Sequence, residues 1–269
     1  MARRARSAVH GGRRPSDLTG PLDALTFKRL RGADRLDHAL LLLSIASSAA
    51  FMATRAWQPF SGSAALKGLA VAPLAILAFR VLRRAERSST PKRPRRVHDS
   101  HILAAALALS CLGDVLLQLS FRRYFFHALC AFLMAHIAYV LLFTRNWPRP
   151  LRPSRIQVTL AALVLAYDVT MFAWLSSALG RLFVPGLAYA SALTAMTVSA
   201  IFAGFPRPLI WIGALLFLIS DSLLATGFKV RMPLAAFLIW PTYYLGQYAI
   251  TIGFLGEKAA ADRAPMFRG

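Results

Sequence analysis

Acidic residues and cysteines are scarce in this sequence. Of 269 residues, 11 are Asp or Glu against 32 Lys and Arg, and two are Cys. Two cysteines exclude a disulfide-rich secreted scaffold. The sequence also lacks a Cys or His spacing typical of a metal site, so we expect neither a metal nor another cofactor. Residues 1–37 lack the apolar core of a signal peptide, and we expect no cleavable one.

Long apolar runs dominate the rest of the chain. The composition is 57% hydrophobic and 16% charged, with a mean hydropathy of +0.52. Runs of about 20 apolar residues match the ~30 Å hydrocarbon core of a bilayer. We therefore predict an all-α, polytopic membrane protein with eight transmembrane helices. The expected helices are 38–57, 64–82, 101–119, 125–143, 156–177, 182–204, 208–226 and 233–255.

These helices are expected to form two tandem four-helix halves, over about 38–143 and 156–255. Residues 1–37 are predicted to be a basic, disordered cytoplasmic arm, residues 83–100 a basic loop, and residues 256–269 a cytoplasmic tail. Composition and charge, rather than any folded-domain signal, mark the arm and the tail.

The distribution of positive charge predicts the orientation. Twenty-five Lys and Arg lie on the side of the two termini, and five lie in the opposite loops. This bias predicts a cell-membrane protein with both termini, and residues 83–100, in the cytoplasm. The same charges can hold anionic lipid headgroups at the inner leaflet. A nucleic-acid partner is not expected, because the basic segments lack stacking aromatic residues.

A repeat places two acids inside the apolar runs. Residues 110–121 and 217–228 share an Asp after a small residue, Leu-Leu two positions later and Phe seven positions later. The offset of 107 residues relates Asp114 to Asp221, and it also relates His136 to Tyr243. Gly113 and Gly246 are expected to permit close helix packing.

An ionised side chain at the bilayer centre costs roughly 2.5–3.5 kcal/mol on insertion scales, so such residues usually face the protein interior. We therefore predict a pocket in the outer half of the membrane, with Asp114 and Asp221 facing each other within roughly 10 Å. The predicted substrate-binding side chains share polarity and depth, and are Lys67, Tyr139, Asp168, Tyr243, Tyr244 and Gln247. His136 is expected to line the same cavity. The structural alternatives remain open: the acids hold helices together through hydrogen bonds or a pair with Lys67, Lys67 snorkels, and His136 and the tyrosines are satisfied core residues.

Four segments in order resemble one known family. Residues 110–117, 131–139, 213–225 and 243–250 look like the lysoplasmalogenase (YhhN-like) integral membrane family, with a resemblance that covers about 38–255. One departure is Lys67-Gly68, where the family usually has Lys-Pro. The resemblance implies a hydrolase that cleaves the vinyl ether bond of lysoplasmalogens into a fatty aldehyde and glycerophospho-ethanolamine or -choline. By resemblance, Asp114, Asp221 and His136 are functional positions, and Lys67, Tyr244 and Gln247 accompany them.

The chemistry of vinyl ether hydrolysis suits this set. Protonation of the β-carbon gives an oxocarbenium ion, water adds, and the hemiacetal collapses. A carboxyl buried in a low-dielectric site can stay protonated as the acid, and a second, ionised carboxylate can stabilise the cation. One of Asp114 and Asp221 would be the acid and the other the stabiliser and base, an order that the sequence leaves open.

His136 and the tyrosines of 233–255 would orient water or the leaving glycerol oxygen, and Lys67 would meet the phosphate. A proton-coupled transporter of a lipid-like or small amphipathic substrate is the main alternative. A non-catalytic membrane scaffold is another.

Overall fold

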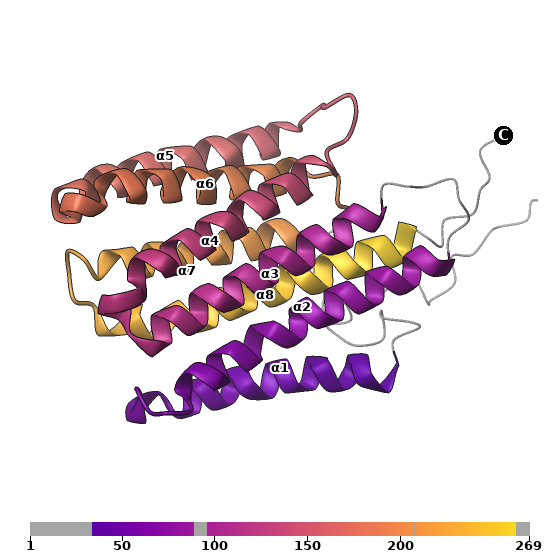
Figure 1. Cartoon of the computed structure of the whole chain (residues 1–269). Coiled ribbons are helices and arrows are strands. Elements are labelled where there is room, and N and C mark those ends of the chain that lie inside the picture. The colour runs from indigo at the N-terminus through magenta and orange to yellow at the C-terminus, as the bar shows by residue number, and fades with distance from the viewer. Residues whose placement is uncertain (1–33, 89–95, 207, 262–269) are drawn as a thin grey trace, which may run out of the picture.

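The computed structural model describes residues 34–88, 96–206 and 208–261. These residues form eight α-helices and contain no strand (Figure 1). In chain order the helices are α1 (Arg35–Ala53), α2 (Ser63–Ser88), α3 (Arg96–Leu119), α4 (Phe121–Thr144), α5 (Arg155–Leu179), α6 (Phe183–Phe202), α7 (Leu209–Thr226) and α8 (Pro233–Ala261). Two single turns of 3₁₀ helix, Arg55–Trp57 and Gly180–Leu182, follow α1 and α5.

The helices have the length and composition of membrane spans. Within the described residues, six stretches are long and apolar enough to cross a membrane. One of them, Arg155–Phe202, is 48 residues long and contains both α5 and α6, whereas α8 is not among the six. The prediction of an all-α, multi-pass membrane protein therefore agrees with the structure. The count of eight crossings stays a prediction.

Several predicted boundaries were wrong, because the helices continue beyond the apolar runs. Where the structure describes it, the predicted loop over 83–100 is helical: α2 extends to Ser88, and α3 begins at Arg96. Helix α1 begins at Arg35 within the predicted arm, and α8 continues to Ala261 within the predicted tail. Hydropathy identifies only the apolar part of a helix, whereas the hydrogen bonds of the helical backbone can continue through charged residues. The rest of the arm, the tail and the loop lies outside the described residues.

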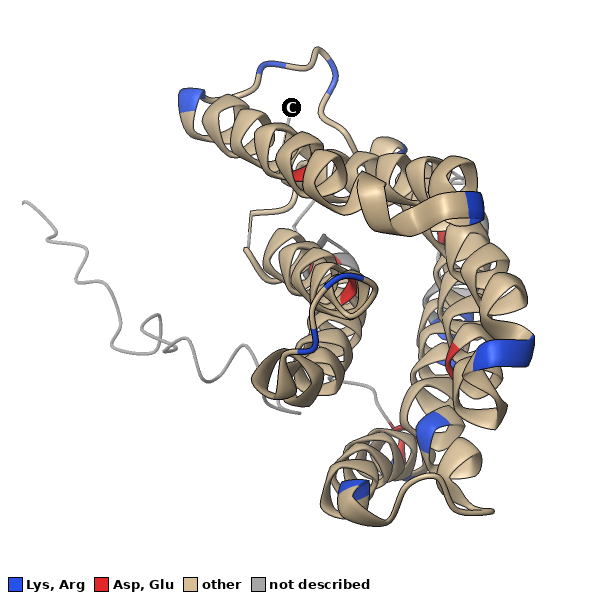
Figure 2. Ribbon diagram, turned by 90° about the vertical axis from the view of Figure 1, so that its left-hand side faces the viewer, with Lys and Arg blue, Asp and Glu red and all other residues tan. Residues whose placement is uncertain are grey.

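Helices α1 to α6 form an arc, and the α7–α8 hairpin lies on its concave side (Figure 2). Neighbours along the arc are α1 and α2, α2 and α3, α3 and α4, α4 and α6, and α6 and α5. The hairpin contacts the arc through α6 against α7 and through α2 against α8. The first residue of α1 and the last of α8 lie at the same end of the bundle (Figure 1).

Four charged residues join α1 to α2 at that end. Asp34 caps α1 by accepting a hydrogen bond from the Asp37 backbone N–H at 2.9 Å. The buried Asp37 carboxylate pairs with Arg80 at 3.1 Å and with Arg84 at 2.5 Å. Both arginines also reach Asp34. Each acid therefore remains paired with one arginine if the other arginine is replaced.

Glycines bring α7 and α8 into close contact. A Cβ atom on Gly246 would lie 2.8 Å from the Gly213 carbonyl oxygen and 3.1 Å from the Phe217 backbone nitrogen. A Cβ atom on Gly113 would lie 2.6 Å from the Phe132 ring. Both predicted close-packing positions are therefore confirmed, and the contact at Gly246 fixes the height of Tyr243 one turn away.

Candidate active site

Asp114 is buried near the last turns of α3, with partners on two other helices. Its side chain is 2% exposed. One carboxylate oxygen lies 3.3 Å from the Lys67 ammonium of α2. The other accepts a hydrogen bond of 2.5 Å from the Tyr243 hydroxyl of α8. Both oxygens of this acid are therefore paired, one by a charge and one by a neutral donor.

The hydrogen bonds continue from Tyr243 into α4. Gln247, one turn further along α8, donates to the Tyr243 oxygen at 3.3 Å. Its carbonyl oxygen accepts from the Tyr139 hydroxyl of α4 at 2.6 Å. Tyr139 and Gln247 are fully buried. Helices α2, α3, α4 and α8 thus share one polar network, defined by Lys67, Asp114, Tyr139, Tyr243 and Gln247, which we call the Asp114 network.

Helix α1 covers the Lys67 side of this network. The Lys67 ammonium faces the rings of Trp240 at 5.4 Å and Phe51 at 5.9 Å, and its side chain is 13% exposed. Ser44 of α1 is 2.9 Å from the Tyr244 hydroxyl, so Tyr244 points toward α1 and away from Asp114. The Trp240 indole donates to Ser48 of α1 at 3.1 Å. Aromatic faces stabilise a cation, and these contacts hold Lys67 in place.

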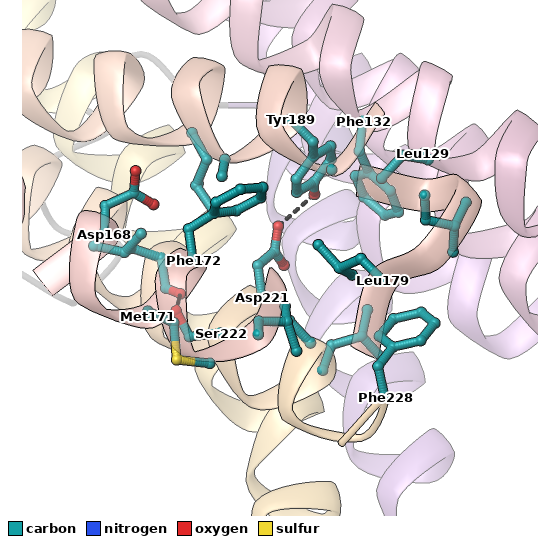
Figure 3. Close-up of a pocket in the computed structure, with 18 of the residues that line it drawn as sticks. Leu129, Phe132, Asp168, Met171, Phe172, Leu179, Tyr189, Asp221, Ser222 and Phe228 are labelled. Carbon is teal, nitrogen blue, oxygen red and sulfur yellow. Dashed lines mark hydrogen bonds between the residues drawn. The ribbon is translucent and has the colours of Figure 1, made fainter. Parts of the chain in front are cut away.

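Asp221 occupies a different setting, in an apolar pocket between α4, α5, α6 and α7 (Figure 3). The Tyr189 hydroxyl of α6 donates a hydrogen bond to its carboxylate. The pocket has a volume of about 120 Å³. Asp168 of α5 and Ser222 are further polar residues in its lining, and Phe132 forms part of its wall. Because this acid faces an open apolar space, it can meet a bound hydrophobic molecule directly.

His136 is buried beside Tyr189, the hydrogen-bond partner of Asp221. Its ring is fully buried and packs edge-on against Tyr189 at 5.0 Å and Phe217 at 4.9 Å. Among the described residues, neither ring nitrogen has a hydrogen-bond partner. An unpaired buried polar group is costly, so this imidazole is a natural position for a water molecule or a substrate oxygen.

Aromatic rings connect the Asp114 network to the pocket. The Phe217 ring lies 5.1 Å from that of Tyr243, the hydrogen-bond donor to Asp114. Phe132 lines the pocket and contacts Tyr243 at 6.0 Å. These ring contacts join the Asp114 network to the wall of the pocket that holds Asp221.

The structure separates the predicted site residues into groups. Five of them form the Asp114 network, Asp221 and Asp168 line the pocket, His136 packs against Tyr189, and Tyr244 binds α1. Tyr189 was not among the predicted site residues, although it is the donor to Asp221. Its signal in the sequence was that of a polar residue within an apolar run, and it lies outside the repeated motif.

No three His, Cys, Asp or Glu side chains gather closely enough to hold a metal ion in the part of the chain that the structure describes. The two aspartates instead have tyrosine hydroxyls as partners, together with the Lys67 ammonium at Asp114.

Comparison with known proteins shows what this chain is similar to. Residues 62–254 match the YhhN family. Two similar curated proteins, named lysoplasmalogenase, come from Mycobacterium bovis (strain ATCC BAA-935 / AF2122/97) and Mycobacterium tuberculosis (strain CDC 1551 / Oshkosh), and each is 31% identical over 166 residues. The alignments cover 60% of this chain and 63% of each relative, so the chain spans less than two thirds of their length. No solved structure matches.

Proposed function

Because the chain belongs to the YhhN family, we propose that it is a membrane-embedded hydrolase that cleaves the vinyl ether bond of lysoplasmalogens. The products are a fatty aldehyde and glycerophospho-ethanolamine or -choline. The observation that carries this proposal is the pair of repeat-related aspartates, one ion-paired and the other in an apolar pocket. The relatives named lysoplasmalogenase support the substrate class.

We assign the general acid to Asp221 and the stabilising charge to Asp114. The Lys67 ammonium at 3.3 Å favours the ionised form of Asp114. Asp221 accepts its hydrogen bond from a neutral hydroxyl and faces apolar side chains, which favour the protonated form. Protonated Asp221 gives its proton to the vinyl β-carbon, and the oxocarbenium ion forms in the field of the Asp114 carboxylate.

Water then completes the reaction. The unpaired imidazole of His136 accepts a hydrogen bond from the attacking water, and the Asp221 carboxylate takes up the proton that this water loses. The hemiacetal hydroxyl then loses its proton while the glycerol oxygen gains one, and the bond between the acetal carbon and the glycerol oxygen breaks to give an aldehyde and a free glycerol hydroxyl. The sum of the steps is one vinyl ether and one water giving one aldehyde and one alcohol, with Asp221 reprotonated.

The proposal includes a location and a topology. We place the protein in the cell membrane, with eight crossings in two tandem four-helix halves and both termini in the cytoplasm. The 25-to-5 charge bias supports this orientation. The helix contacts support the two halves. If each helix of the first half corresponds to the helix four places later, α2 corresponds to α6 and α4 corresponds to α8. The contact between α2 and α8 then has its counterpart in the contact between α6 and α4. The repeat-related Phe121 and Phe228 also touch, with ring centroids 6.4 Å apart.

The decisive experiment measures aldehyde release from a lysoplasmalogen by the detergent-purified protein. Asp114→Asn and Asp221→Asn are nearly isosteric and retain hydrogen bonding, so we expect both proteins to fold. Each should lose at least about 100-fold in kcat, because general acid catalysis alone contributes roughly 10²–10⁴-fold. Asp37→Asn is the matched control. Asp37 is a buried acid of α1 that pairs with Arg84 at the other end of α2 from Lys67, so its neutralisation should leave kcat unchanged.

Full activity in both site variants, or activity lost only in step with thermal unfolding, would remove the aspartates from the mechanism. Substrate flux into liposomes without aldehyde release would instead favour a proton-coupled transporter.

A further inference from the structure

The pocket that holds Asp221 extends to one end of the bundle. Its lining includes Leu179 at the end of α5, Leu182 in the following turn and Phe228 just after α7, and we call these three residues the rim. This is the end opposite the first residue of α1 and the last of α8 (Figure 1). The chain neighbours of Leu182 and Phe228 are Arg181 and Lys229. Two exposed basic residues therefore adjoin the rim in the sequence.

The positive charge at this end is not neutralised by acids. The connections 54–62, 180–182 and 227–232 contain Arg and Lys but no Asp or Glu. Figure 2 views the bundle from this end. Lys229 is held by neutral groups: its ammonium donates to the Trp174 carbonyl at 2.5 Å and to the Ser177 hydroxyl at 2.9 Å. It also lies 5.0 Å from the centre of the Trp174 ring. Its charge is fixed in position and available to an anion.

The depth of Asp221 below this end can be compared with the distance from the vinyl ether to the phosphate in the substrate. Asp221 comes five residues before Thr226, the last residue of α7. At 1.5 Å per residue, its backbone lies about 7.5 Å below the helix end. In a lysoplasmalogen, seven bonds separate the vinyl β-carbon from the phosphorus. An extended chain of seven bonds spans about 8 Å, at 3.3–3.6 Å for every three bonds. A phosphate at the helix end thus puts the reacting carbon level with Asp221.

From these observations we infer that Lys229 and Arg181 bind the phosphate of the substrate at the rim, with the alkenyl chain in the apolar pocket. This inference rests on the proposed function for the identity of the substrate. It assigns the phosphate to the rim and not to Lys67, whose ammonium is already paired with Asp114. With both termini in the cytoplasm, the rim faces the outer leaflet, so the enzyme takes lysophospholipids from that leaflet.

The test measures binding separately from turnover. The probes are 1-O-alkyl-lysophosphatidylcholine, whose saturated ether lacks the reactive double bond, and 1-O-alkylglycerol, which lacks the phosphate. Binding is followed by tryptophan fluorescence in a neutral detergent, because Trp174 lies beside Lys229. Lys229→Gln and Arg181→Gln should each weaken binding of the phospholipid about tenfold, which corresponds to roughly 1.4 kcal/mol for one charge-assisted contact. The affinity for 1-O-alkylglycerol should change by less than about twofold, because this probe lacks the phosphate.

Arg231→Gln is the matched control. It removes the same charge from the same connection, but Arg231 is two residues further than Lys229 from Phe228 of the rim and lines a neighbouring cavity. Lys229→Arg keeps the charge and should retain most of the affinity, which separates charge from folding. The inference is overturned if Arg231→Gln weakens binding as much as Lys229→Gln, if both probes respond alike, or if neither rim variant changes binding.

Aldehyde release from a lysoplasmalogen is measured in parallel. Phosphate-dependent binding without aldehyde release would refute the proposed function and leave the phosphate site standing. Aldehyde release that is unaffected by both rim variants would leave the function standing and refute the site.

Discussion

Replacement of Lys67 by methionine tests the electrostatic core of the proposed mechanism. Methionine keeps the length and apolar character of the lysine stem but removes the cation 3.3 Å from the Asp114 carboxylate. Asp114 is 2% exposed, so water cannot replace the lost charge. Removing one partner of a buried ion pair typically costs about 3–5 kcal/mol. For a chain of this size, that cost lowers Tm by roughly 6–20 °C, at about 2–4 °C per kcal/mol.

The variant should also lose its activity. Without Lys67, we expect the protonated form of Asp114 to have the lowest free energy, because an isolated buried carboxylate is strongly disfavoured. A neutral Asp114 cannot stabilise an oxocarbenium ion, and we expect kcat to fall by at least about 100-fold, as for removal of an electrostatic stabiliser. Adding Asp114→Asn to Lys67→Met removes the unpaired acid as well. This double variant should regain most of the lost stability but none of the activity.

Thermal unfolding in detergent and aldehyde release are measured on the two single variants and the double variant. Arg80→Met is the control, since it also removes a cation from a buried acid, but Asp37 keeps its contact with Arg84 at 2.5 Å. If the double variant is as unstable as the sum of the singles, Lys67 and Asp114 are not coupled. If Lys67→Met is fully active, the charge of Asp114 does not depend on Lys67 and the assignment of roles fails.

Two further predictions concern topology and packing. In a background without the native cysteines, an impermeant reagent applied to intact cells should label a cysteine placed at position 231 but not one placed at position 93; the reverse pattern would invert the protein in the membrane. Gly246→Ala places a methyl group 2.8 Å from the Gly213 carbonyl oxygen. It should therefore lower the free energy of unfolding by about 1–3 kcal/mol, as overpacking does; an unchanged Tm would mean that α8 can shift away from α7 at no cost.

The sequence predicts the helical architecture well because the bilayer imposes a simple pattern. Apolar runs of one length identify the helices, and the 107-residue repeat is enough to identify the two equivalent acids. The helix ends at Ser88 and Arg96 were missed for a physical reason. Charged residues end an apolar run without ending the helix, since their side chains reach water while the backbone continues its hydrogen bonds.

The partners of the acids were harder to predict. The ion pair between Lys67 and Asp114 was one of several open alternatives, because helical periodicity gives a face but not the neighbour that meets it. Tyr189 and Asp221 lie 32 residues apart on consecutive helices, and no repeated motif marks the tyrosine. Tyr244 was expected in the site, yet it turns toward Ser44 of α1. Adjacent tyrosines on a helix face different neighbours: Tyr243 donates to Asp114 of α3, whereas Tyr244 meets α1.

The contact between Asp114 and Tyr243 has a consequence for how the protein is made. The two residues are 129 positions apart, and α8 is the last of the described helices to leave the ribosome. At about 5–20 residues per second, Asp114 waits on the order of ten seconds for its tyrosine partner. Lys67 precedes Asp114 in the chain, so the ion pair can form before the tyrosine is made. We therefore expect a chain that ends before α8 to keep the ion pair but to lack the hydrogen bond from Tyr243, and so to be less stable in the membrane.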